Sequence, residues 1–490
     1  MKKTKKLLSL ALAFTMIISA LTGCGSSASN SSTAAAPSAA PSSASATSDS
    51  GKKDFENKTL NIAVFQGGYG SAYWDAVIEK FEAAYPGVKV NMNINPKIGE
   101  IIRPQIVAGN VPDFISLNDT EPSGLILSMI KEKALMDITD VFEDKALDKD
   151  TKLKDMILPG FLDSTKFAPY KDGKIYLAPF NAGAMGLVYN KTLFKEKGWK
   201  VPETWDEFFA LQKELDKPEN YLVNADGTKT KRALFTYQGI YPSYLEEILW
   251  PAIVSSVGVD GMDKLTSYQE GSFKNANVKK VLDIFAKIGT GGYLMPGTVA
   301  LNHTQSQADM MMGKSIFIVN GNWMENEMKD SPREKDFEFG MAPVPTFSAT
   351  DKKYVLASYE QFSIPAKAKN PELAKEFLKF LYTDDSVKLF AEKAGGVYAL
   401  KDAQGLVKDI LTSNGTKPSF VYDSFSTFDN ATSMMMNWEA LPKGSKVNVG
   451  DEVFTKCMTP VMNGSMTTDQ WMDSVEKAFK QIRSDLAAAK

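Results

Sequence analysis

The residue types that most often perform catalysis or bind metal ions are scarce in this chain of 490 residues. Its one histidine, His303, has no second histidine or cysteine near it in sequence, so a histidine metal site or a Ser-His triad is hard to assemble. Of its two cysteines, Cys24 belongs to the N-terminal segment, and Cys457 is expected to be a small buried hydrophobic residue. We therefore expect no catalytic residue, no metal ion and no cofactor.

Three further patterns could support chemistry, but each is incomplete. The sequence Met312-Gly313-Lys314-Ser315 ends like a nucleotide-binding loop, yet Ala308 occupies the position of its first glycine. The glycine-rich loop from Gln66 to Gly70 lacks the order G-x-G-x-x-G and the lysine of such a loop. Carboxylates are abundant, but a glycosidase needs two of them about 5 to 9.5 Å apart, and no spacing in this chain indicates such a pair.

Composition and charge limit the partners of the chain. Its formal net charge is −3, and without four lysines in an N-terminal segment that we expect to be removed it is nearer −7, from −3 − 4. Because proteins that bind nucleic acid concentrate Lys and Arg, we expect no nucleic-acid partner. Aromatic residues make up 11% of the chain, so some can be spared for a binding face, although core packing must account for most of them.

Two lobes are the natural expectation for a chain of this length. From Leu60 to Ser116 the pattern alternates strand, helix, strand, helix and strand, which predicts a parallel sheet with helices on its faces. In such sheets ligands bind beyond the carboxyl ends of the strands. This rule selects the loops Gln66 to Tyr73 and Asn118 to Glu121, in which the candidate contacts are Gln66, Tyr69, Asn118 and Asp119. The alternative for the first loop is an ordinary tight turn.

The stretch from Lys174 to Leu215 joins a buried strand to a docked helix. Met185 to Tyr189 is predicted to be the strand, and Thr204 with Glu207 forms a capping box that starts the helix. The succession DGKIYLAPFNAGAMGLVYNKTLF, followed by GW-x-VPETWDEF, resembles the segment of family 1 extracellular solute-binding proteins that crosses from the first lobe to the second. This similarity runs from about Leu60 to Ile482 and includes FGMAPVP and VLASYEQFSIP.

The resemblance implies an α/β, periplasmic-binding-protein-like fold with two interleaved lobes and a hinge of three crossovers. The implied division of the chain is 55–180 plus 360–400 for lobe 1, and 181–359 plus 401–490 for lobe 2. The lobes of such proteins close over a sugar. The segments FQGGYGSAYWDA and KIGEIIRPQIVAGNVPDF are most similar to a subgroup that takes N-acetylglucosamine and its β-linked disaccharide.

The resemblance also implies ligand contacts. Asn181 ends the first hinge strand and would face the cleft, and Trp323, which follows Asn322, would stack on a pyranose. The C–H face of such a ring offers apolar contact to an indole, while its hydroxyls bind amides and carboxylates around the rim. The alternative for Trp323 is packing in a core. The remaining implied contacts are Trp250, Tyr359 and Glu360.

Residues 1–23 have the features of a lipoprotein signal peptide. Four lysines precede an apolar run from Leu7 to Leu21, which is shorter than the roughly 20 residues that span a bilayer. The sequence Leu21-Thr22-Gly23-Cys24 matches the lipobox of bacterial lipoproteins, in which the cysteine carries the lipid. Residues 24–54 are then a flexible tether, because they are mainly Ser, Ala, Thr, Asn and Pro. The alternative is a secreted protein with an incidental cysteine.

The family resemblance, together with the N-terminal pattern, implies a monomeric, lipid-anchored receptor at the extracytoplasmic face of the cell membrane. It would bind a mono- or oligosaccharide, such as N-acetylglucosamine or its disaccharide, and deliver it to the permease subunits of an ABC transporter. Two alternatives stay open: a secreted glycan-active enzyme, and a receptor for a peptide or another small solute.

Overall fold

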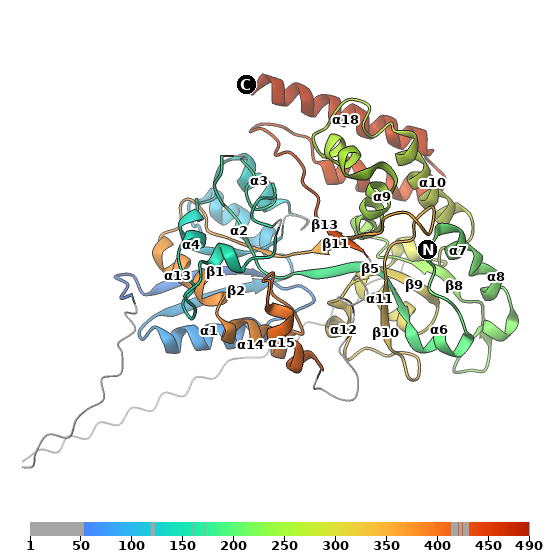
Figure 1. The fold of residues 1–490 in the computed structure, drawn as a ribbon, viewed down its shortest axis with the longest axis horizontal. Helices are drawn as coiled ribbons and strands as arrows, with labels where there is room; N and C mark the ends of the chain where they lie inside the picture. The colour runs from blue at the N-terminus through green and yellow to red at the C-terminus, as the bar shows by residue number, and fades with distance from the viewer. Residues whose placement is uncertain are drawn as a thin grey trace, which may run out of the picture. The chain divides into compact units, whose positions relative to one another are not determined.

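The computed structural model describes residues 53–118, 123–159, 161–170, 172–412, 420, 424 and 431–489. The predictions for the signal peptide, Cys24 and most of the tether, and that for Asp119, lie outside these ranges. Within the described part, two β-sheets organise the chain, each with its own hydrophobic core (Figure 1). No helix among the described residues is long and apolar enough to cross a bilayer.

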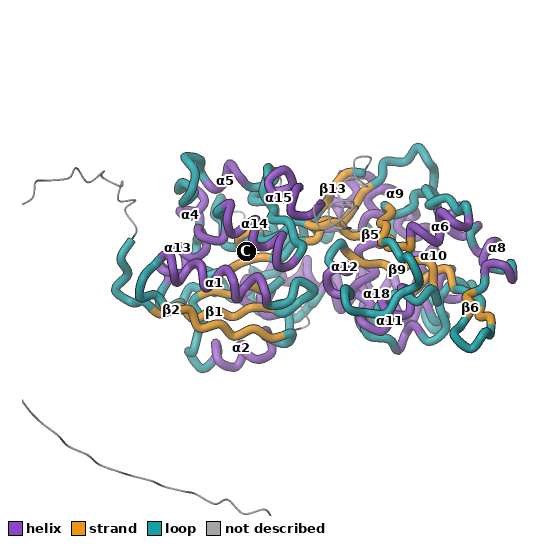
Figure 2. Tube along the Cα trace, turned by 90° about the horizontal axis from the view of Figure 1, so that it is seen from below, coloured by secondary structure: helices purple, strands orange, loops and turns teal. Residues whose placement is uncertain are grey.

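The first lobe is built on a five-stranded sheet in the order β2-β1-β3-β12-β4. Strands β1, β2 and β3 are parallel, and β12 runs antiparallel to β3 and β4. The chain moves outward from β1 to β2 and then back past β1 to β3, so right-handed crossovers place α1 and α2 on opposite faces, as Figure 2 shows. The predicted alternation of strands and helices is therefore confirmed. The elements of this lobe are β1 (Thr59–Phe65), α1 (Ala72–Ala84), β2 (Lys89–Asn95), α2 (Ile98–Val107), β3 (Phe114–Ser116), α3 (Leu125–Lys131), α4 (Thr139–Glu143), α5 (Leu153–Met156), β4 (Ala178–Pro179), β12 (Gln361–Ser363), α13 (Pro371–Leu381), α14 (Asp384–Ala394) and α15 (Ala403–Thr412).

The second lobe is built on a sheet in the order β13-β11-β5-β9-β8, with β10 also paired to β5. Side chains alternate along β9: Phe317 and Val319 enter the larger core with α9, α10 and α18, whereas Ile318 enters a smaller core with α11. The elements are β5 (Gly183–Asn190), α6 (Lys191–Lys197), α7 (Trp205–Ala210), α8 (Gln212–Leu215), η1 (Pro218–Asn220), β6 (Leu222–Val223), β7 (Lys229–Thr230), β8 (Ala233–Thr236), η2 (Pro242–Leu245), α9 (Glu246–Thr266), α10 (Ala276–Thr290), η3 (Thr298–Ala300), α11 (His303–Met311), β9 (Ser315–Gly321), α12 (Met324–Glu327), β10 (Phe339–Ala342), β11 (Tyr354–Ser358), β13 (Thr432–Met434), η4 (Asp451–Thr455), α17 (Met458–Met462) and α18 (Thr468–Ala488).

The chain passes between the two sheets three times. It leaves the first sheet after β4 and enters the second at β5, and it returns between β11 and β12. The third passage, from α15 to β13, lies largely outside the described residues. The first lobe also contains α15, beyond the expected boundary at residue 400, because Ala403, Val407 and Leu411 pack into its core.

Local signals at helix starts had mixed outcomes. Thr204 and Glu207 form the predicted capping box of α7. Asn370 precedes Pro371 at the start of α13 but makes no side-chain cap. Its amide instead donates to the backbone oxygens of Asn57, at 2.8 Å, and Thr59, at 3.0 Å, because tertiary partners compete for the same side chain.

A buried carboxylate joins β1 to the segment before α13. Asp113 is 1% exposed, and its Oδ2 accepts hydrogen bonds from the backbone N and the Nδ2 of Asn61, at 2.9 and 3.2 Å. Its Oδ1 accepts from the backbone N of Lys369 and of Asn370, both at 2.9 Å. One side chain therefore satisfies four donors contributed by segments some 300 residues apart in the chain.

Replacing Asp113 with Ala removes the acceptor of three part-buried hydrogen bonds and of the buried one from Asn370, and we expect the free energy of unfolding to fall by about 3 kcal/mol. Urea denaturation of the variant measures this loss. The exposed Asp163→Ala serves as control and should change stability by less than about 0.5 kcal/mol. A loss below about 1 kcal/mol in Asp113→Ala would show that the first lobe does not depend on this carboxylate.

Candidate functional site

Loops from both sheets converge where the two lobes meet. Strand β5 begins directly after the first crossing and runs antiparallel to β9, so Met185 near its start pairs with Gly321 at the carboxyl end of β9. The carboxyl end of β9 therefore points toward the first lobe (Figure 1). The loop after β1 reaches the same place, because the Nδ2 of Asn326 donates to the backbone oxygen of Gly68 at 2.9 Å.

Two of the crossings are joined by hydrogen bonds. The Oδ1 of Asn181 accepts from the backbone N of Glu360 at 2.6 Å, and the backbone N of Phe180 donates to the oxygen of Glu360 at 2.8 Å. Asn181 is 1% exposed, and its Nδ2 has no hydrogen-bond partner among the described residues. The neighbouring Gln361 is also buried, and neither its Nε2 nor its Oε1 has a hydrogen-bond partner among the described residues. The crossings thus carry amide groups with unused hydrogen-bonding capacity.

Glu360 and Tyr69 lie together beside these crossings. Burial of the Glu360 carboxyl raises its pKa from 4.5 to about 7. Burial, and then the charge of Glu360, raise the pKa of the Tyr69 hydroxyl, which lies near the Asn181 amide. A Cβ on Gly67 would lie 3.6 Å from the Oε1 of Glu360, so the loop after β1 covers this carboxyl. Tyr69, Asn181 and Glu360 form one group on the first lobe.

Asn322 and Trp323 follow the carboxyl end of β9 in the second lobe, and Trp323 reaches the loop after β1. The backbone N of Asn322 donates to the oxygen of Ala184 at 3.1 Å, while both polar atoms of its buried side chain lack partners among the described residues. Trp323 is half-buried and packs against the core of the first lobe. Its indole lies so close that a Cβ on Gly68 would be 3.0 Å from Cδ1, and a Cβ on Gly321 would be 1.9 Å from the ring. Glycine at 321 is therefore what lets the indole fold back over β9.

The second lobe holds two further carboxyl groups, those of Glu247 and Glu327, that the sequence patterns did not single out. The buried Glu247 at the start of α9 has a pKa raised well above its usual range by burial, and its Oε2 has no partner among the described residues. Glu327, one helical turn after Trp323, accepts from the Nε2 of Gln307 at 3.2 Å and lies 3.5 Å from the Nε2 of His303. Burial, and then the charges of Glu327 and Glu247, raise the pKa of the Tyr244 hydroxyl.

The other predicted contacts have varied positions. Gln66 is exposed in the loop after β1, and Asn118 is half-buried just after β3. Tyr359 packs edge-on against Phe167, with ring centroids 5.7 Å apart. The structure does not bring Trp250 to this group: it is 1% exposed in the second core, edge-to-face with Trp438 and Phe454 at 5.5 and 5.8 Å. These contacts come from η4, which contains Phe454, and from the segment around Trp438, and they cover the Trp250 ring.

The arrangement suits non-covalent recognition. It offers an indole, a phenol, several amides and carboxyls from two lobes, which together match the polar rim and aromatic surface that a sugar requires. Across the part of the chain that the structure describes, no group of three or more His, Cys, Asp and Glu residues is placed to hold a metal ion.

Comparison with known proteins adds independent evidence. Residues 67–388 match the family described as bacterial extracellular solute-binding protein. The chain is 27% identical over 368 residues to the diacetylchitobiose binding protein NgcE of Streptomyces coelicolor, covering 73% of this chain and 72% of that protein. It is 23% identical over 335 residues to the multiple sugar-binding protein of Streptococcus mutans serotype c, covering 66% and 71%.

Solved structures show the same fold. A chitin oligosaccharide binding protein superposes with a TM-score of 0.65 at 18% identity, covering 88% of this chain and 100% of that one. The solute-binding protein RafE in complex with raffinose gives a TM-score of 0.62 at 18% identity, covering 87% and 99%. The expected two-lobed α/β fold is confirmed.

The raised pKa of Glu360 predicts a pH dependence of stability. Because the folded state holds this proton up to about pH 7 and the unfolded state only up to about pH 4.5, stability is full below pH 4.5 and falls as pH rises through 7. Allowing for partial exposure, we expect wild type to lose about 2 kcal/mol more than Glu360→Gln between pH 4.5 and 8. Urea denaturation across this range measures the difference, with the exposed Glu196→Gln as control. Parallel curves for wild type and Glu360→Gln would contradict the assignment.

Proposed function

The chain belongs to the bacterial extracellular solute-binding proteins, and from this we propose that it is a receptor that binds a carbohydrate between its two lobes and delivers it to an ABC importer. The observation that carries the proposal is the packing of the Trp323 indole, from the second lobe, on Gly68 of the loop after β1, whose neighbouring residue Gly67 lies against the Glu360 carboxyl. An aromatic surface and polar groups drawn from opposite lobes are what a sugar ring needs on its face and its edge.

The unsatisfied amides support a polar ligand. A buried polar group without a partner costs about 1 to 3 kcal/mol, and Asn181, Gln361 and Asn322 all carry such groups at the junction. Sugar hydroxyls donate and accept hydrogen bonds, so a saccharide placed there removes several of these costs together. It would bind best when both lobes surround it, and this difference in affinity favours the closed arrangement.

Opening of the junction is needed for this ligand to enter. The indole of Trp323 packs on Gly68, and the Asn326 amide binds the same residue, so the second lobe rests directly on the loop after β1. The first two crossings are only a few residues long, which suits them to act as hinges between rigid sheets. We propose that the lobes part at the Gly68 contact and close again over the sugar.

The disaccharide of β-linked N-acetylglucosamine is our first choice of ligand. A relative that shares 27% identity over most of its length is named for binding diacetylchitobiose. An acetamido group adds one N–H donor and one carbonyl acceptor to the ring hydroxyls, and the junction offers both amide and carboxyl partners for them. We propose that the protein binds this sugar without breaking a bond, since the relatives with assigned roles are named as binding proteins.

We propose that the N-terminal segment holds this receptor at a membrane. We propose that Cys24 is lipidated after cleavage behind Gly23, and that the Ser- and Ala-rich residues that follow tether the folded body to the extracytoplasmic face. A related maltooligosaccharide-transporter protein of Streptococcus pneumoniae is named as a solute-binding lipoprotein. We propose that the receptor acts as a monomer, and that its membrane partners are the permease subunits of the importer.

Replacing Trp323 with Ala should weaken binding of diacetylchitobiose about 30-fold, which corresponds to about 2 kcal/mol. Isothermal titration calorimetry measures the affinity, and mass spectrometry of the recovered sugar checks that it stays intact. Trp199→Phe, a change far from the junction on the second lobe, should leave the affinity unchanged. Equal affinities of Trp323→Ala and wild type would show that Trp323 does not contact the sugar. Hydrolysed sugar would favour a glycan-active enzyme.

Replacing Cys24 with Ala should release the protein from the membrane, because the lipid would have no sulfur to join. Partition between detergent and aqueous phases after expression in a bacterial host with lipoprotein processing measures the anchoring. Cys457→Ala is the matched control, since it removes the other cysteine and should leave the protein in the detergent phase. Retention of Cys24→Ala in that phase would rule out this anchor.

A further inference from the structure

A cavity of about 390 Å³ lies in the first lobe and shares no lining residue with the lobe junction. Its walls come from the segment that follows α3, from Tyr170, Asp172 and Tyr176, and from Ala366. This volume lies within the range of small-ligand pockets, about 300 to 1,000 Å³. None of the roles proposed for the chain uses this cavity.

Two tyrosine rings form a corner of the cavity. Tyr170 and Tyr176 meet edge-to-face, with centroids 4.6 Å apart and planes at 76°. The hydroxyl of Tyr170 donates to the backbone oxygen of Ile130 at 2.8 Å, and that of Tyr176 donates to the Oδ2 of Asp172 at 2.8 Å. Because both hydroxyls are bound, the rings are held in place before any ligand arrives. Leu135 and Met136 add apolar lining.

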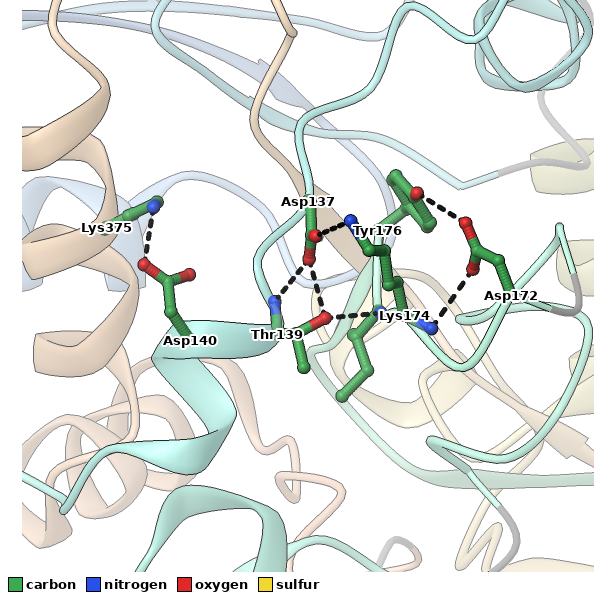
Figure 3. Close-up of polar contacts among 8 residues, drawn as sticks. Asp137, Thr139, Asp140, Asp172, Lys174, Tyr176 and Lys375 are labelled. Carbon is green, nitrogen blue, oxygen red and sulfur yellow. Dashed lines mark hydrogen bonds and ion pairs between the residues drawn. The ribbon is translucent and has the colours of Figure 1, made fainter.

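Charged groups of both signs surround this corner. The Oδ1 of Asp137 accepts from the backbone N and the hydroxyl of Thr139, at 3.0 and 2.6 Å, and its Oδ2 pairs with the Nζ of Lys174 at 2.8 Å (Figure 3). Asp172 also accepts from the backbone N of Lys174 at 3.1 Å. Figure 3 shows these carboxylates on either side of Lys174 and Tyr176. They stand at fixed positions on the cavity wall.

Lys133 also lines the cavity, beside the Tyr170 ring. It follows the last turn of α3 in the left-handed region, with φ 51°, a conformation that Ile130 and Met129 stabilise by accepting from the backbone N of Lys133 and Ala134. Its Nζ lies 5.7 Å from the centroid of the Tyr170 ring. The cavity thus combines two ring surfaces with carboxylate acceptors and an ammonium donor, and its charges nearly balance.

We propose that this cavity is a second saccharide site, which takes one neutral pyranose unit on the outside of the first lobe. A pyranose places C–H groups against aromatic surface and hydroxyls against Asp172 and Lys133. The balanced charge disfavours strongly anionic or cationic ligands. Because one lobe supplies every contact, the site binds without lobe closure and has an affinity on the order of millimolar.

Met136 provides a local reporter for the test. Its methyl group, labelled with ¹³C in the full chain and assigned with Met136→Leu, is followed by NMR during titration with diacetylchitobiose to about 50 mM, well above the expected affinity. We expect the signal to shift in wild type and equally in Trp323→Ala. Tyr176→Ala should abolish the shift, Tyr176→Phe should keep it, and Lys133→Ala should raise the concentration at half-saturation at least threefold. Lys352→Ala, which removes a lysine placed over Tyr354 in the second lobe, should change nothing.

The outcomes separate this site from the lobe junction. A Met136 shift whose half-saturation matches the junction affinity from calorimetry, and which moves with that affinity in Trp323→Ala, would overturn the proposal, because it would report lobe movement instead of local binding. An unmoved signal in wild type, or shifts unchanged in both Tyr176→Ala and Lys133→Ala, would also overturn it. If Met136 shifts but calorimetry detects no binding tighter than millimolar, the cavity site would be supported and the proposed function at the lobe junction would be contradicted.

Discussion

The hydrogen bonds between the first two crossings are the constraint on which the site depends. Asn181 accepts from the backbone of Glu360, and Phe180 donates to the same residue, so two short connections are held as one unit between the sheets. This pairing fixes the Glu360 carboxyl and the Asn181 amide at the boundary of the lobes. We propose that the lobes turn about this unit, which would keep the first-lobe half of the site in place.

The second lobe brings its half of the site through the end of one strand. Glycine at 321 allows the indole of Trp323 to fold back, and α12 then sets Asn326 on Gly68 and Glu327 toward α11. Each lobe is stabilised by its own large core. Asn181 and Gln361, on the crossings, and Asn322, after β9, have unused hydrogen-bonding capacity, and we propose that a ligand from solution reaches them when the lobes part. In the proposed function, stability is carried by the cores and recognition by the junction.

Sequence patterns predicted the order of elements better than the direction of side chains. The first-lobe alternation, the strand from Met185 to Tyr189 and the Thr204 capping box depend on local periodicity and local hydrogen bonds, and the structure has all three. Trp250 illustrates the limit: α9 is buried on nearly every side around it, so no amphipathic stripe shows which neighbour it faces. Glu247 was overlooked for the same reason, although a glutamate at the start of the apolar run ILWPAIV is the available signal. The Asn181 and Glu360 contact joins residues 179 positions apart, a pairing that no local pattern encodes.

A crystal structure with diacetylchitobiose would show where the sugar binds. We predict that one sugar ring lies against the Trp323 indole between the lobes, with hydrogen bonds to Asn181 or Glu360 on one side and to Asn322 on the other. A sugar bound elsewhere, with Trp323 still packed on Gly68, would contradict this prediction.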